Sequence, residues 1–207
     1  MVGLRIVIRR PRFPLFLNRE IVMNDSGNEI ERAWIFNPTH KDKWRNFVAY
    51  NLAIIKHDVG YLVSDEYGEV RILKKESYPS PLLIMTVKSR GDLSRKEWET
   101  LIPQWVFDQM WARTYGSRLS KMRLYVPYHL SNTDYVLETD VYQKKLSGLL
   151  RIECEFSSEE EASRFTLPLN IRDCVYEVTN DVRFKNKNLA TNGLPEGWQD
   201  VFNNELG

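Results

Sequence analysis

Cysteine and histidine are scarce in this 207-residue sequence. Its two cysteines, Cys154 and Cys174, are too few to frame a secreted domain with disulfides, so we expect the chain to reside in the reducing cytoplasm. The three histidines, His40, His57 and His129, lie far from one another and from the cysteines along the chain. This spacing argues against a zinc site built from histidine and cysteine. A metal ion bound here should therefore have carboxylate ligands.

Long hydrophobic runs and an excess of one charge are also absent. No apolar stretch reaches the length of a signal peptide or a membrane span, so we expect a soluble, unprocessed chain with no membrane partner. Lys and Arg number 29 against 28 Asp and Glu, a net charge of +1, so we expect no nucleic-acid partner either. The length suits one domain around one main core.

Short strands dominate the pattern of alternating residues, which predicts an α+β, mainly β protein. Strands are expected over 4–10, 29–36, 69–74, 82–90, 121–127, 135–142, 150–156 and 175–179. Helices are expected over 41–55, 101–114, 158–165 and 196–204, with loops over 76–81 and 168–174. So many successive strands with few helices between them argue against a parallel doubly wound sheet.

The polar face of these strands is ionic from one strand to the next. Glu29 and Glu31 share one face of their strand while Ile30 and Trp34 share the other, because strand side chains alternate with period two. Arg32 is the exception, a charge on the apolar side. The ionic faces of the later strands carry Arg71, Lys88, Lys121 with Arg123, Asp140 with Glu138, and Glu153 with Glu155.

Such strands can form an open sheet with its charges in solvent, or a closed barrel with a charged lumen. For a single strand the solvent-facing arrangement is the commoner one, but its repetition over six strands favours the barrel. A lumen of mixed charge suits a ligand that carries both signs. A polyphosphate bound to Mg²⁺ or Mn²⁺ is such a ligand, because carboxylates ligate these cations while Lys and Arg bind phosphate oxygens.

At these residues the sequence resembles the CYTH family of triphosphate tunnel metalloenzymes, in particular its short bacterial members. The opening E-I-E-R-A-W at 29–34 resembles the family signature E-x-E-x-K. Further matches follow in the family's order: G-E-V-R-I-L at 68–73, T-V-K at 86–88, S-R-K-E-W-E at 94–99, K-M-R at 121–123, L-E-T-D-V-Y at 137–142, G-L-L-R-I-E-C-E-F-S-S-E-E-E-A at 148–162 and E-V-T-N-D-V-R-F-K-N-K-N-L-A at 177–190.

The resemblance implies a closed eight-stranded antiparallel β-barrel with flanking helices, the triphosphate tunnel. It implies hydrolysis of inorganic tripolyphosphate or a nucleoside triphosphate with Mg²⁺ or Mn²⁺, or cyclisation of ATP in other branches. The implied metal ligands are Glu29, Glu31 and Glu155, with Glu153 and Asp140 close by. The implied phosphate-binding residues are Arg71, Lys88, Lys121, Arg123 and Arg183. Direct catalytic roles are expected for Glu29, Glu31, Lys88 and Arg123.

Two departures from the family pattern bear on activity. Ala33 stands where the signature has lysine, and Leu73 stands where a second arginine is expected. Losing two cations would weaken the stabilisation of a transferring phosphoryl group while ligand binding could survive. The alternative to hydrolysis is therefore a catalytically impaired barrel that binds or sequesters a phosphorylated nucleotide or signalling ligand.

The likeness places a tunnel domain over 29–190, with 191–207 as a helical tail of the same domain. The preceding 1–28 form an extension rich in arginine. This extension can be an edge strand with a solvated arm, or it can close one mouth of the tunnel and add cations.

Overall fold

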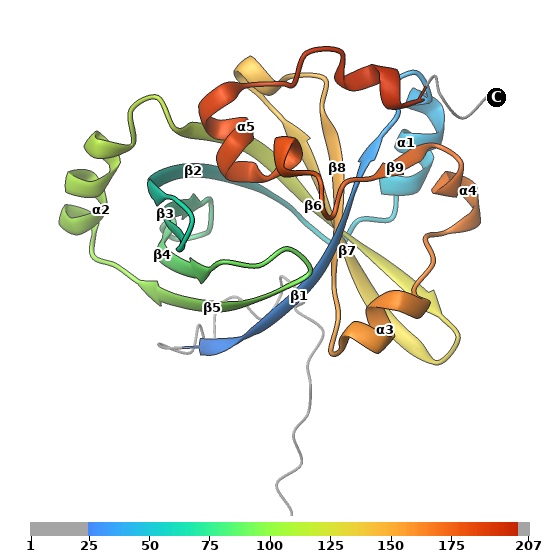
Figure 1. Ribbon diagram of the computed structural model, residues 1–207, viewed down its shortest axis with the longest axis horizontal. Helices are drawn as coiled ribbons and strands as arrows, with labels where there is room; N and C mark the ends of the chain where they lie inside the picture. The colour runs from blue at the N-terminus through green and yellow to red at the C-terminus, as the bar shows by residue number, and fades with distance from the viewer. Residues whose placement is uncertain (1–24, 203–207) are drawn as a thin grey trace, which may run out of the picture.

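The computed structural model describes residues 25–202, in which eight strands close into an antiparallel barrel (Figure 1). The strands are β1 (Asp25–Phe36), β2 (Ile54–Ser64), β3 (Gly68–Lys75), β4 (Leu82–Ser89), β5 (Ser94–Leu101), β6 (Arg118–Leu130), β7 (Thr133–Tyr142) and β8 (Leu150–Glu155). Their order is β5-β4-β3-β2-β6-β7-β8-β1, and pairing of β1 with β5 closes the ring. The predicted fold class is confirmed.

Strand β1 forms the seam of the barrel. Its first half pairs with β5, up to Ile30 opposite Ser94. Its second half pairs with β8, beginning at Glu31 opposite Glu155. A short strand, β9 (Val175–Glu177), pairs with the end of β1. The change of partner therefore falls beside the two glutamates of the E-x-E motif.

Short helices surround the barrel. They are α1 (Lys41–Val48), α2 (Gln104–Trp111), α3 (Glu159–Arg164), α4 (Leu169–Arg172) and α5 (Asn186–Asn192), with 3-10 turns η2 (Ala112–Thr114), η3 (Lys144–Leu146), η4 (Val182–Phe184) and η5 (Trp198–Phe202). Within residues 25–202, none of these helices is both long and apolar enough to cross a lipid bilayer.

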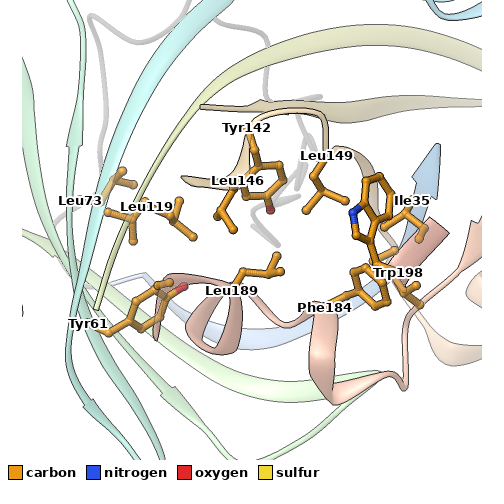
Figure 2. Packing of buried hydrophobic residues seen from close by; sticks show 14 of the residues in the cluster. Ile35, Tyr61, Leu73, Leu119, Tyr142, Leu146, Leu149, Phe184, Leu189 and Trp198 are labelled. Atoms are coloured by element: carbon orange, nitrogen blue, oxygen red, sulfur yellow. The ribbon is translucent and has the colours of Figure 1, made fainter. Parts of the chain in front are cut away.

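Apolar residues form one cluster outside the barrel wall and another inside it. Outside, Trp34 and Ile152 pack with Phe165 beneath α1, α3 and α4. Inside, one end of the barrel is filled by strand residues that meet Phe184 and Leu189 of η4 and α5, as Figure 2 shows. Ile35, Leu73, Leu119, Leu146 and Leu149 belong to this inner cluster. The lumen thus has an apolar floor, and its charged residues lie on the other side of that floor.

Two strands were not predicted. Strand β2 begins at Ile54, where the sequence predicted the end of a helix, and α1 already ends at Val48. Strand β5 was missed because S-R-K-E-W-E-T-L is mostly polar on both faces. Helix α5 was also missed, and the loop expected over 168–174 contains α4.

Two other predicted elements lie wholly or partly outside the described residues. The strand expected over 4–10, and with it most of the arginine-rich extension, lies outside the described residues. Of the helix expected over 196–204, the described part is the 3-10 turn η5.

Arg32, the charge on the apolar side of β1, connects β1 to α3 and to the residues around β9. Its guanidinium donates to both carboxylate oxygens of Glu177 at 2.9 and 2.6 Å. It also donates to the carbonyl oxygens of Ala162 and Phe165, at the end of α3, at 2.7 and 3.1 Å. Arg32 therefore satisfies carbonyl groups that have no partner within the helix.

We predict that Arg32→Met lowers the free energy of unfolding by about 2 kcal/mol, because it removes charge-assisted hydrogen bonds from a half-buried site. Arg164→Met, which breaks the exposed ion pair with Glu160, should lower it by less than about 1 kcal/mol. Urea denaturation of both variants measures the difference. Equal losses would show that Arg32 acts only as a surface charge.

Candidate functional site

A cavity inside the barrel is lined by equal numbers of acidic and basic side chains. Eight are basic: Arg71, Lys75, Lys88, Arg95, Lys121, Arg123, Arg151 and Lys185. Eight are acidic: Glu29, Glu31, Glu69, Glu97, Glu99, Glu138, Glu153 and Glu155. His57, Tyr61, Asn186, Val59 and Leu73 complete the lining. The lining as a whole is close to electrically neutral.

The strand register explains why so many charges meet in the lumen. Glu69 lies opposite Lys88 on β4, and Lys88 lies opposite Glu97 on β5. Arg123 lies opposite Asp140 on β7 in the same way. Side chains that are opposite across a ladder share one face of the sheet. The ionic face that alternation predicts for each single strand thus faces the lumen, where it meets the ionic faces of the other strands.

The first cluster in the lumen joins β1, β4 and β5. Lys88 Nζ contacts both oxygens of Glu29 at 2.7 and 2.9 Å, and Arg95 Nε contacts the same carboxylate at 2.6 Å. Burial acts to raise the pKa of Glu29, but Lys88 and Arg95 outweigh it and hold that pKa far below its ordinary value. Lys88 also lies 3.3 Å from Glu97. Burial raises the pKa of Glu97 to about 7 despite this lysine.

The second cluster joins β6, β7 and β8. Asp140 has no exposed surface, and Arg123 donates to both its oxygens at 2.7 Å while Lys121 donates to one of them. Arg123 also contacts Glu138 and Glu153. Burial lowers the pKa of Lys121 to about 7, an effect that Arg123 reinforces and Asp140 opposes. Asp140 thus fixes the position of two cations that reach the lumen.

The third cluster lies at the β1–β8 pairing. Glu31 and Glu155 are directly opposite each other, and both line the cavity. Arg151 lies 3.5 Å from Glu31 and also contacts Glu153. Glu31 of β1 and Glu153 of β8 are therefore both held close to the buried guanidinium of Arg151.

The distances between the acidic side chains of the lumen show how they can ligate a metal ion. No three His, Cys, Asp or Glu side chains between residues 25 and 202 lie close enough together to hold a metal ion by themselves. Mg²⁺, however, commonly takes one or two protein carboxylates and completes its shell with water and substrate phosphate oxygens. The opposed pair Glu31 and Glu155 fits a hard divalent cation that enters with a phosphate ligand.

Comparison with known proteins agrees with this architecture. No family model matches the sequence. An inorganic triphosphatase from Nitrosomonas europaea is 41% identical over 107 residues, which span 51% of this chain and 66% of that protein, just under two thirds of its length.

Two solved structures share the fold over most of the chain. They are those of the inorganic triphosphatase NE1496 and of the hypothetical protein NE1496, with 28% and 29% sequence identity. Each has a TM-score of 0.50 and covers 81% of this chain, together with 97% and 99% of the respective solved chain. The predicted resemblance to the CYTH family is confirmed.

The structure brings most of the predicted site residues into one lumen. Those that line the cavity are Glu29, Glu31, Arg71, Lys88, Lys121, Arg123, Glu153 and Glu155. Asp140 and Arg183 are placed differently. Asp140, predicted as a metal ligand, lies beneath the lining, where Lys121 and Arg123 occupy its oxygens.

Arg183, predicted to bind phosphate, lies outside the lumen. It sits in the 3-10 turn η4, where it is half exposed and pairs with Asp181 at 2.6 Å. Lys185, two residues further on, points into the cavity instead. Of the two cations in the R-F-K segment, Lys185 therefore lines the lumen and Arg183 does not. The two-residue period of a strand does not predict which side chain faces the lumen here, because this segment is not a strand.

Several further residues that line the lumen were not predicted from the sequence. His57 and Tyr61 were missed because β2 was not recognised as a strand. Arg95 was missed with β5, and Lys75 lies one residue beyond the predicted end of its strand. Arg151 could have been found from the sequence, since it shares the face of Glu153 on a predicted strand.

The two departures from the family signature lie toward the floor of the lumen. Leu73 lines the cavity where an arginine was expected, and Lys75 follows on the same face of β3. Ala33 is buried in the inner apolar cluster, opposite Glu153. A lysine at position 33 would meet Glu31 and Glu153, the two carboxylates that Arg151 contacts here.

We predict that Glu97 makes stability depend on pH. Because its pKa of about 7 in the folded protein exceeds the ordinary value of 4.5, the protonated group contributes stability below about pH 4.5. This contribution is lost as the pH rises toward 7. In Glu97→Gln the free energy of unfolding should therefore fall less steeply, or rise more steeply, across this interval than in the wild type. Urea denaturation at several pH values measures the slope, and an unchanged slope would contradict the prediction.

Proposed function

We propose that the barrel hydrolyses inorganic triphosphate in the presence of Mg²⁺ or Mn²⁺. The observation that carries the proposal is the balanced charge of the lumen, with eight acidic and eight basic side chains. A free polyphosphate anion would disturb this balance, whereas its complex with divalent cations is nearly neutral. The 41% identity to a protein named an inorganic triphosphatase supports the same substrate.

The basic residues of the lumen would bind the phosphate oxygens. Lys88 contacts Glu29, and Arg123 contacts Glu153 besides Asp140, so phosphate oxygens can replace these two glutamates without a change of fold while Asp140 keeps its contacts. Arg71 lies 3.7 Å from Glu97, also within the lumen. Arginine offers two parallel donors and lysine a single point charge, which together suit the several oxygens of a triphosphate.

The acidic residues would hold the metal. Glu31 and Glu155 are the first candidates, with Glu29 and Glu153 next to them on the same faces. A bound divalent cation supplies charge neutralisation and an activated water in reactions of this class. The protein's own part is to hold the terminal phosphoryl group between fixed cations and to keep Lys121 and Arg123 in place through Asp140.

In the proposed reaction, water attacks the terminal phosphorus and the bond to the bridging oxygen breaks. The products are orthophosphate and diphosphate. Negative charge develops on the leaving bridging oxygen and on the equatorial oxygens. Arg123 and Lys88 lie buried in the lumen, where such charge is stabilised more strongly than in water.

Binding without hydrolysis is the second candidate function, and Ala33 and Leu73 are the observations that favour it. Both positions lack the expected cation. The structure nevertheless has Arg151 beside Glu31, and Lys75 two positions from Leu73 on the same face. We propose that these two residues replace the missing cations, which makes hydrolysis the first candidate.

We also propose the domain division that the sequence predicts: a tunnel domain over 29–190, with 1–28 as an extension and 191–207 as its tail. The protein is placed in the cytoplasm, which the two free, buried cysteines of the described chain support.

The direct test is phosphate release from tripolyphosphate with Mg²⁺ or Mn²⁺, with ATP as a second substrate. We predict release that EDTA abolishes and that falls at least about a hundredfold in Glu31→Gln. Glu160→Gln, on the exposed face of α3, is the matched control and should keep wild-type activity. Tight calorimetric binding without release would establish the second function, and neither binding nor release would contradict both.

The replacement of the lost lysine has its own test. Arg151→Met should lower kcat/KM for tripolyphosphate at least about tenfold, because it removes a cation from the phosphate site. Adding Ala33→Lys to Arg151→Met should recover part of this loss, since the lysine meets the same two carboxylates. Ala33→Lys alone should give no gain. A gain from Ala33→Lys alone, with none in the double variant, would show that Arg151 has a different role.

A further inference from the structure

Four buried side-chain polar atoms in the described chain have no hydrogen-bond partner, and all four belong to residues that line the lumen. They are His57 Nε2, Tyr61 Oη, Arg71 Nε and Arg151 Nε. Buried polar atoms without a partner destabilise a fold, so they are rare unless a ligand or water completes them. Their gathering in a single cavity indicates that the cavity is built to hold a polar ligand.

His57 differs from the other three residues. Arg71 and Arg151 place other nitrogens in ion pairs with glutamates. The hydroxyl of Tyr61 lies close enough to Arg71 for that guanidinium to act on the pKa of the phenol. No hydrogen bond of the His57 ring is found within residues 25–202, although only 3% of the residue is exposed. A histidine with a purely structural role in a core normally has a partner.

Cations surround His57 on the lumen wall. Its neighbours across the two adjacent ladders are Lys75 on β3 and Lys121 on β6. Burial, Arg123 and these two lysines together hold the pKa of His57 well below its ordinary value, and Asp140 only partly opposes them. The imidazole is therefore neutral and carries a single N–H group.

The cations near His57 determine whether a positive or a negative ligand group can bind beside it. Three cations near His57 would repel a metal ion, so the imidazole is poorly placed as a metal ligand. The same cations attract a phosphate oxygen, and a neutral imidazole can offer that oxygen its N–H. A neutral donor also leaves the charge balance of the lumen unchanged.

We propose that His57 binds the substrate directly, by donating a hydrogen bond from Nε2 to a phosphoryl oxygen held between Lys75 and Lys121. This inference rests on the proposed function, because it names a further substrate contact in the same lumen. Strand β2 then contributes to substrate binding, together with the strands that carry the charged motifs.

Three substitutions at His57 separate binding from packing. His57→Leu removes the donor. His57→Gln keeps an amide N–H near the position of Nε2. His57→Asn also keeps an amide N–H, but on a side chain that is shorter by one methylene group. His129→Leu, at an exposed histidine on β6, is the matched control.

We expect kcat/KM for tripolyphosphate with Mg²⁺ to fall about tenfold to a hundredfold in His57→Leu, the range for a lost hydrogen bond to a charged group. His57→Gln should retain most of the activity, and His57→Asn should retain less than His57→Gln. The ligand-free Tm of His57→Leu should equal or exceed that of the wild type, because the variant removes a buried polar atom that has no partner. A structural histidine would give the opposite result, a lower Tm in all three variants.

Wild-type kcat/KM in His57→Leu would overturn the inference while leaving the proposed hydrolysis intact. A wild-type protein that releases no phosphate would overturn the hydrolysis instead. The His57 contact is then decided by calorimetry with tripolyphosphate and Mg²⁺, where weaker binding by His57→Leu than by His129→Leu supports it and equal binding contradicts it. A wild-type protein that neither releases phosphate nor binds tripolyphosphate would overturn both.

Discussion

A closed barrel with charged residues inside has to neutralise them without bulk water, and this constraint shapes the rest of the molecule. The network around Asp140 shows how the constraint is met. The carboxylate is fully buried and takes hydrogen bonds from Lys121 and Arg123, while Arg123 also contacts Glu138 and Glu153. Each charge in this network has partners on neighbouring strands, so the removal of one leaves others buried and unpaired.

Buried ion pairs of this kind contribute little to stability compared with well-packed apolar residues. The apolar clusters supply that stability elsewhere. Phe165 and its neighbours cover the barrel from outside, and Phe184 and Leu189 close one end from inside (Figure 2). The charged residues of the lumen can therefore bind a ligand, because phosphate oxygens can replace the glutamates that contact Lys88 and Arg123. Stability and function are thus divided between different layers of the same barrel.

The sequence predicted the parts of the site that follow the strand period. Glu29, Glu31, Lys88 and Arg123 reach the lumen because alternation fixes their face once the barrel closes. The period assigns a side chain to a face of the strand but gives no information about its depth. It therefore does not show that Asp140 lies beneath the lining.

The two strands β2 and β5 were missed for different reasons. Strand β2 begins where the sequence predicted the end of a helix, and β5 is polar on both faces. Strand β5 shows little alternation between apolar and polar residues, so S-R-K-E-W-E-T-L resembles a loop when read alone. Its charges find partners on the two neighbouring strands, where Arg95 meets Glu29 of β1 and Glu97 meets Lys88 of β4. Sites built from long-range ion pairs therefore remain partly hidden until the strand order is known.

A crystal structure with Mn²⁺ and a triphosphate analogue that cannot be hydrolysed tests the proposed site most directly. We expect an anomalous Mn²⁺ peak between Glu31 and Glu155, phosphate oxygens on Lys88 and Arg123, and a broken ion pair between Lys88 and Glu29. A Mn²⁺ peak or a phosphate chain outside the barrel, with the ion pairs of the lumen intact, would contradict the proposed site.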